Sequence, residues 1–203
     1  MSTTATAAAD YPATTFAFDP PEKIARWRPL VHWLLAIPHF IVAYVLMFVA
    51  EVLAFVAWIL GVFTGKVPEG ILGVVAMCVR YNTRVGVYVS FLKEEYPPFS
   101  FGTTFTDPGD DPRVQINFVP DTEGRNRLTI FFRILMLIPH IIVLYVIGLV
   151  AFFVYVIGFF AVLFTGKWPT GLQNFVVGLL RWNTRVSAYM FLLNDKFPPF
   201  GFK

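Results

Sequence analysis

The chain has little of what enzymes use for chemistry. Among 203 residues it has one cysteine, Cys78, and three histidines, so an intrachain disulfide is excluded. No carboxylate or cysteine recurs beside the histidines at a ligand-like spacing, and the nucleophile, zinc and phosphate-loop motifs are missing. We therefore expect a protein that is not an enzyme and that uses no cofactor and no metal ion.

Charge is also scarce. Charged residues make up 14% of the chain and hydrophobic residues 57%, whereas a typical soluble domain has about 25% charged residues. This deficit indicates that lipid is part of the solvent. The net charge of +3 is too small to indicate a nucleic-acid partner and suits contact with anionic lipid.

The chain repeats itself. Shifted by 101 residues, residues 26–101 match residues 127–202 without a gap, at about 29 of 76 positions. The recurring motifs are Ile-Pro-His, Phe-Thr-Gly-Lys-x-Pro-x-Gly, Arg-x-Asn-Thr-Arg-Val and Pro-Pro-Phe. Such repetition sets the architecture before any local detail. It predicts a disordered N-terminus (1–12), a first repeat (13–101), a cytoplasmic linker (102–124) and a second repeat (125–203).

Each repeat predicts an elbow followed by a membrane hairpin. Residues 22–37 mix cations with Trp and Leu, which is typical of a helix in the headgroup layer. The apolar run then continues to Phe63, and one straight helix from Leu30 would be about 50 Å long against a hydrocarbon core of about 30 Å. Pro38 predicts the bend. The predicted elements are elbows at 22–37 and 127–138 and spanning helices at 38–63, 68–92, 139–164 and 169–193.

The fold class is thus an all-α integral membrane protein with four transmembrane helices in two tandem hairpins, interfacial elbows and a small cytoplasmic sheet. Residues 100–105 and 113–119 alternate around a turn at 107–111 and predict a β-hairpin in the linker, with 14–18 and 199–203 as further candidate strands. Only Lys66 and Lys167 lie in the hairpin turns, so the positive-inside rule predicts a multi-pass protein of the cell membrane with both termini cytoplasmic. Both repeats would then run the same way.

The motifs resemble those of the bacterial membrane protein family known as domain of unknown function 4389 (DUF4389). The resemblance covers Arg-Trp-x-Pro-Leu, Ile-Pro-His, Phe-Thr-Gly-Lys-x-Pro-x-Gly, Arg-x-Asn-Thr-Arg-Val and Pro-Pro-Phe, in two tandem copies. It implies an integral membrane protein of bacterial type and brings no activity and no functional residue. The second repeat departs from the pattern at residues 127–130, where the first has Arg26-Trp27-Arg28-Pro29.

Candidate ligand-binding or lipid-binding residues lie in the arginine motif and at one acid. They are Arg80, Asn82, Arg84, Arg181, Asn183, Arg185 and Glu51. In a spanning helix Arg80 would lie near mid-bilayer, where a lone arginine costs at least ~2.5 kcal/mol and so faces the protein interior. The motif is either a pocket for an anionic headgroup or a structural lock between hairpins. Glu51, at the same predicted depth, is a candidate ion-pair partner of Arg80 or Arg181.

Two functions remain open. The first is a non-enzymatic accessory, scaffold or lipid-interacting subunit of a bacterial membrane complex, whose partners are membrane lipids, anionic headgroups among them, and other membrane proteins. The second is a small transporter or channel that uses the arginines and Glu51. The two differ in whether the arginines share one water-accessible cavity or make separate packed contacts.

Overall fold

The structure is a computed structural model that describes residues 11–202, and it is mostly helical with one small sheet. In chain order its elements are β1 (Thr14–Phe18), α1 (Arg28–Leu35), α2 (Ile37–Thr64), α3 (Glu69–Val89), β2 (Val114–Phe118), α4 (Arg127–Phe131), α5 (Arg133–Thr165) and α6 (Thr170–Met190). Disorder was predicted for residues 1–12, and of these residues 1–10 lie outside the part that the structure describes.

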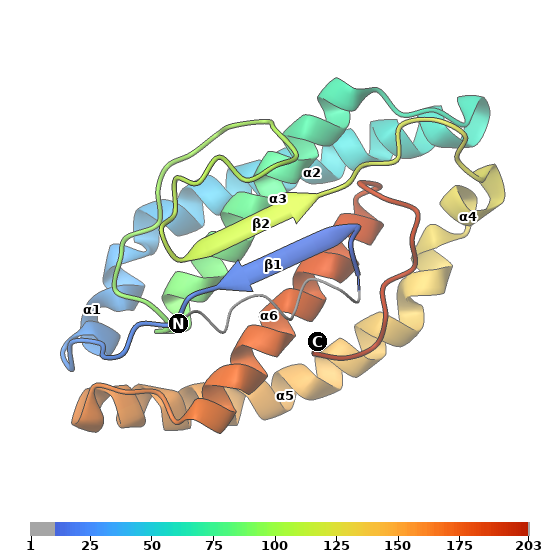
Figure 1. Ribbon diagram of the computed structural model, residues 1–203. Coiled ribbons are helices and arrows are strands. Elements are labelled where there is room, and N and C mark those ends of the chain that lie inside the picture. Colours follow the sequence, from blue (N-terminus) through green and yellow to red (C-terminus); the bar gives the residue numbers. More distant parts are fainter. Residues whose placement is uncertain (1–10, 203) are drawn as a thin grey trace.

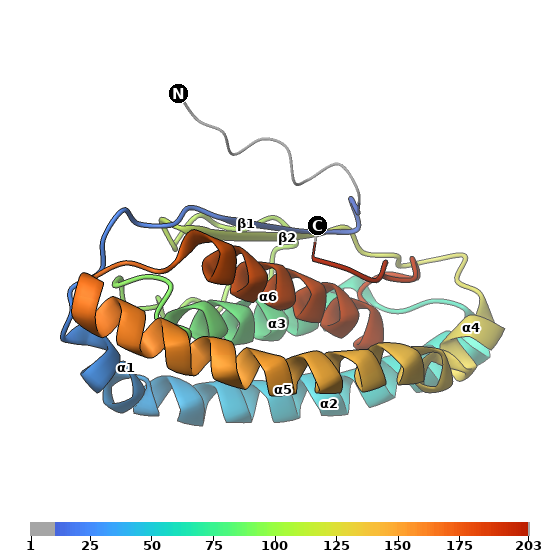
Figure 2. The same cartoon turned by 90° about the horizontal axis from the view of Figure 1, so that it is seen from below.

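The elements form three layers. Figure 2 shows the two strands on one side, α3 and α6 beneath them, and the long helices α2 and α5 on the opposite side. The hairpin partners α2 and α3 pack together, as do α5 and α6, and α3 contacts α6 at the centre of the molecule. In both views α2 and α5 run in opposite directions (Figure 1).

The helix break predicted near Pro38 in the first repeat is confirmed, but the helix before it begins at Arg28 and not at residue 22. Helix α1 ends at Leu35 and α2 begins at Ile37, with Pro38 in the first turn of α2, where its missing N–H leaves no helical bond unmade. In the second repeat the bend comes earlier than predicted, at Phe132, and Pro139 lies inside α5. The Asn126 side chain caps α4 by accepting from two backbone N–H groups. This cap fixes where α4 starts, and α4 ends at Phe131, well before Pro139.

The two helices of each hairpin differ in kind. Among the described residues only α2 and α5 are long and apolar enough to cross a membrane. Helix α3 is buried on nearly all sides, with Arg80 and Arg84 among its buried residues, and α6 lies in the same middle layer (Figure 2). The predicted second and fourth spanning helices are therefore the interior layer of the fold.

The predicted small sheet is present, but it is not a hairpin within the linker. Strand β1 pairs antiparallel with β2, with Phe16 opposite Ile116, so the prediction of a strand at 14–18 is confirmed. Residues 100–105 form no strand. The carbonyls of Gly102, Thr104 and Phe105 instead accept hydrogen bonds from Arg80, which takes acceptors that a strand ladder would need.

The hairpin turns lie against the start of the other repeat. The Ile24 N–H donates to the Gly166 carbonyl at 2.8 Å, and at the equivalent position the Arg125 N–H donates to Gly65 at 3.2 Å. Lys66 also forms an ion pair with Glu123 of the linker at 3.0 Å. The predicted topology placed these turns across a bilayer from the linker, and that arrangement is wrong because hydrogen bonds join the two.

Candidate functional site

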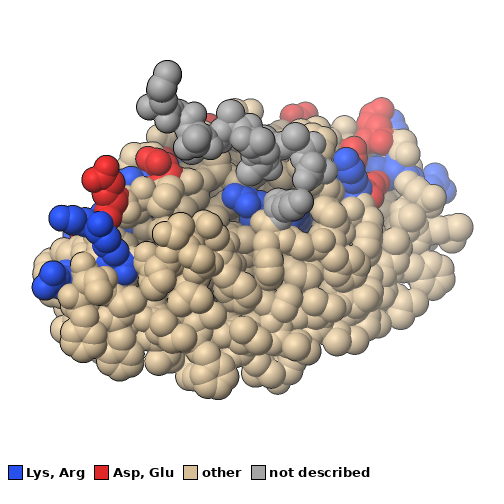
Figure 3. All heavy atoms as spheres, turned by 60° about the horizontal axis from the view of Figure 1, so that its bottom comes forward, with Lys and Arg blue, Asp and Glu red and all other residues tan. Residues whose placement is uncertain are grey.

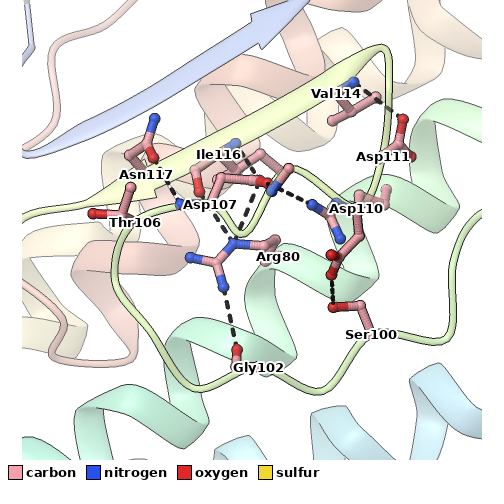
Figure 4. A network of polar contacts seen from close by, with 12 residues as sticks. Arg80, Ser100, Gly102, Thr106, Asp107, Asp110, Asp111, Val114, Ile116 and Asn117 are labelled. Carbon is pink, nitrogen blue, oxygen red and sulfur yellow. Dashed lines mark hydrogen bonds and ion pairs between the residues drawn. The ribbon is translucent and has the colours of Figure 1, made fainter.

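The arginine motif of the first repeat binds the linker (Figure 4). Arg80 is 3% exposed. Its guanidinium donates to the carbonyl of Ile116 on β2 at 3.1 Å and to those of Thr104 and Phe105 at 2.8 and 3.1 Å. Buried charge is tolerated where hydrogen bonds satisfy it. Arg80 thus fastens an irregular segment of backbone onto α3.

Asp107 supplies the counter-charge. One carboxylate oxygen accepts from Arg84 at 2.7 Å and from the Gly109 N–H at 2.8 Å. The other accepts from the Ile116 N–H at 2.8 Å and lies 3.6 Å from the Arg80 Nε. All three charged side chains are at most 3% exposed. The cluster is therefore a closed ionic network with its donors and acceptors largely used internally.

The second motif repeats the design on the other half of the chain. Arg181 donates to the carbonyls of Phe16 on β1 and Phe202, at 3.4 and 3.0 Å, and Arg185 donates to Gly201 at 2.7 Å. The two motifs make separate packed contacts. The alternative of one shared, water-accessible arginine cavity finds no support in this geometry.

A pseudo-two-fold axis passes through this centre. Arg80 Nε donates to Ile116, and the equivalent Arg181 Nε donates to Phe16, the residue opposite Ile116 in the sheet. Beneath them the equivalent hydroxyls of Thr83 and Thr184 lie 3.1 Å apart. The axis therefore runs through the layers, perpendicular to the long helices.

The Ile-Pro-His and Pro-Pro-Phe motifs meet on each side of this axis. His39 hydrogen-bonds the Tyr81 hydroxyl at 2.6 Å and stacks on Phe99 at 4.3 Å. The equivalent His140 accepts from Trp182 at 3.1 Å and stacks on Phe200 at 3.8 Å. The aromatic partner on the helix is the residue after the first arginine of the motif. The recurring residues thus hold one another in place.

The remaining predicted site residues are scattered. Asn82 and Asn183 are exposed, and Asn183 accepts a hydrogen bond only from Ser187, at 3.3 Å. Glu51 is exposed on α2, so the predicted Glu51–Arg80 ion pair is wrong, since Asp107 takes that place. Glu51 and Arg80 were predicted to lie at the same depth in the bilayer, but depth alone does not show that the Glu51 side chain is exposed.

Three ion pairs in two buried clusters were not predicted. Lys93 pairs with Asp111, and both side chains are 0% exposed; burial lowers the pKa of Lys93 from its ordinary value, while Asp111 opposes that shift. Asp195 pairs with Arg125 and Arg133. Burial acts to raise the pKa of Asp195, but these two arginines more than offset it and the pKa is lowered. The sequence signal was the charge of Lys93 and Asp195 just before the two Pro-Pro-Phe motifs.

The contacts of this region join segments that lie far apart in the chain. No group of three or more His, Cys, Asp or Glu side chains that could hold a metal ion occurs within residues 11–202. No nucleophile lies beside a base in the network, and the one thiol, Cys78, is buried. What the arrangement does is lock linker, sheet and both hairpins together.

The comparisons with known proteins give a family and no more. The family described as "Domain of unknown function (DUF4389)" matches residues 26–100 and 127–201. No curated protein and no solved structure matches the chain. The two matches coincide with the two halves related by the pseudo-two-fold axis. The chain therefore belongs to the DUF4389 family and carries two tandem copies of its domain.

Proposed function

We propose that this protein is a non-enzymatic, lipid-interacting membrane protein that embeds its outer layer, α2 and α5, in a single leaflet. In this arrangement the long helices lie parallel to the bilayer plane and the strand layer faces water. The pseudo-two-fold axis then lies along the membrane normal. The leaflet we propose is the cytoplasmic one of the bacterial cell membrane.

The supporting observation is the exposed face of the two long helices. Only 22% of the most apolar stretch of α2 and 17% of that of α5 is buried inside the protein. The large side chains left exposed on α2 are Ile37, Phe40, Ile41, Tyr44, Val45, Phe48, Val52, Phe55, Val56, Ile59 and Phe63. Apolar patches beyond a few hundred Å² mark contact with a partner or a membrane.

The amount of apolar surface on this face argues against its exposure to water. Fully burying one such side chain is worth about 1.5–3 kcal/mol, and α5 exposes a similar set. Their sum is tens of kcal/mol even after a discount for partial burial. That free energy is gained only when an apolar medium covers the face, which supports contact with lipid.

The sheet argues against spanning. The two strands extend along the same direction as the long helices (Figure 1). If α2 and α5 crossed the bilayer, an open two-stranded edge would cross it too, and unpaired strand edges do not occur in hydrocarbon. The length of α5 also argues against spanning. Its 33 residues extend about 50 Å, which is well beyond the ~30 Å thickness of the hydrocarbon core.

The transporter alternative loses its main support. A transport path would require the arginines and Glu51 to lie together at one depth in the membrane. The arginines instead bind backbone carbonyls and Asp107 on the strand side of α3. Glu51 is exposed on α2 instead. A lipid-interacting or scaffolding role uses the exposed face that a transport path leaves unexplained.

Thiol labelling tests the proposal. Single cysteines at Lys66, Lys167 and Gln115 are introduced into a Cys78→Ala background and reacted with a membrane-impermeant maleimide. Single-leaflet embedding predicts that all three label only from the cytoplasmic side, in inverted vesicles. Labelling of positions 66 and 167 from outside intact cells, with 115 labelled from inside, would restore the spanning topology.

A further inference from the structure

The cations that the fold leaves without a partner gather at its two ends. Most of the Lys and Arg side chains within residues 11–202 form ion pairs, hydrogen bonds or ring contacts. The exceptions are Lys23, Arg26, Arg127 and Lys167. Figure 3 shows charged side chains at both ends of the molecule and others nearer its middle, above a broad face that shows no charged side chain.

The two ends are built alike. At the first end Arg26 packs beside Gly166, where its Cγ would lie 3.7 Å from an added Cβ, and Lys167 follows this glycine. At the second end Arg127 packs beside Gly65, with its Nε 3.5 Å from the same position, and Lys66 follows. We call these the α5 end (Lys23, Arg26, Lys167) and the α2 end (Lys66, Arg127).

Both glycines are required by the turn that creates the ends. Gly65 and Gly166 have φ of 71° and 73° and close the C-termini of α2 and α5, a left-handed conformation that favours glycine. Each accepts a backbone hydrogen bond from the other repeat. An arginine from one repeat and a lysine from the other therefore meet at each end.

Large apolar side chains accompany the cations. Phe164 and Trp27 are 67% and 55% exposed at the α5 end, and their equivalents Phe63 and Leu128 are 74% and 69% exposed at the α2 end. Cations next to exposed aromatic and aliphatic groups, at the edge of an apolar face, match the depth of lipid headgroups. A free anion would need no such apolar surroundings.

We infer that each end binds the phosphate of an anionic phospholipid, whose chains lie against the exposed face of α2 or α5. This inference rests on the proposed membrane embedding. Arg contributes a planar fork of donors to phosphate and Lys a point charge. Because Glu123 already pairs with Lys66, the α5 end has more free positive charge and is the stronger site.

Native mass spectrometry in detergent micelles tests the inference by counting retained phosphatidylglycerol. The wild-type chain is expected to retain two molecules. Arg26→Gln/Lys167→Gln should lose the tighter one and Lys66→Gln/Arg127→Gln the weaker, with affinity falling about fivefold for each cation removed. Lys196→Gln, an exposed cation stacked near Tyr11, is the control and should retain both lipids.

The inference is overturned if the double variants retain as much phosphatidylglycerol as the wild type, if Lys196→Gln loses as much as they do, or if the wild type retains phosphatidylcholine equally well. Displacement of the lipid by inorganic phosphate at the same concentration would also contradict it, since the site is proposed to use the lipid chains as well. All substituted residues are exposed, and a thermal melt confirms that each variant folds. The lipid count does not depend on helix orientation, so its failure is distinguishable from failure of single-leaflet embedding.

Discussion

The hydroxyls of Thr83 and Thr184, which occupy the same position in the two repeats, lie 3.1 Å apart at the centre of the protein. Each also lies within hydrogen-bond distance of the carbonyl four residues earlier, at 2.9 and 2.8 Å. Two hydroxyls have two protons for three such contacts. One hydroxyl therefore donates across the axis while the other donates within its own helix.

This sharing predicts a non-additive pair of substitutions. Thr83→Val alone leaves a buried hydroxyl on Thr184 with one partner fewer, and we expect a loss of about 1 kcal/mol in the free energy of unfolding. The double variant Thr83→Val/Thr184→Val removes both groups and is expected to cost less than the sum of the single variants. Chemical unfolding of the four proteins in detergent measures the coupling, and simple additivity would argue against contact at the axis.

Asp107 is predicted to be the residue on which the arginine network depends most. Asp107→Asn removes the carboxylate facing Arg80 and Arg84, both buried, and breaking a buried pair costs about 3–5 kcal/mol. A thermal melt should show a large drop in Tm. Asp110→Asn, three residues away and exposed, is the matched control. Its hydrogen bond from Ser100 can still be accepted by the asparagine oxygen, so stability should change by less than ~0.5 kcal/mol. Equal effects would contradict a specific role for Asp107.

The contact between Gly158 and Trp168 predicts a compensating pair. A Cβ at Gly158 would lie 2.0 Å from the Trp168 ring, so Gly158→Ala is expected to cost about 1–3 kcal/mol through overpacking. The equivalent positions of the first repeat hold Ala57 and Val67, both buried. Gly158→Ala/Trp168→Val installs that combination and should recover part of the lost stability. No recovery would mean that the repeats do not pack equivalently here.

His32 predicts a loss of stability in mild acid. It is fully buried, and burial lowers its pKa from 6.5 to about 4. Below about pH 6.5 His32 binds a proton in the unfolded chain but not in the folded one. The free energy of unfolding therefore falls progressively from pH 6.5 to about 4, by up to ~1.4 kcal/mol per pH unit. Melts of wild type and His32→Phe across this range should show a shallower slope for the variant. Identical slopes would contradict a buried neutral histidine.

Much of the fold could be predicted from residue patterns because it is local or repeated. The helix break before Pro38, the long apolar helices, the strand at 14–18 and the duplication follow from periodicity and self-similarity. The expectation that both repeats run the same way is wrong, since α2 and α5 are antiparallel. The inward orientation of the arginines follows from the cost of their charge. The two motifs were correctly predicted to be related, and their arginines make structural contacts as one of the two alternatives had it, but the predicted partner Glu51 is wrong.

What could not be predicted depends on contacts between distant segments. Backbone carbonyls, such as that of Ile116, carry no sequence signal as arginine acceptors. The antiparallel arrangement of α2 and α5 rests on hydrogen bonds from Ile24 to Gly166 and from Arg125 to Gly65. Charge counting assumes that hairpins cross the bilayer, so it separated both turns from the segments that they contact.

Spin-label depth along α5 tests the central claim most directly. Ile138, Tyr145 and Phe152 are each two turns apart on the exposed face of this helix, so nitroxides there report depth from their relative accessibility to oxygen and to a nickel chelate. Single-leaflet embedding predicts the same depth at all three positions. A gradient of about 20 Å from the first to the third, as in a helix that crosses the bilayer, would contradict it.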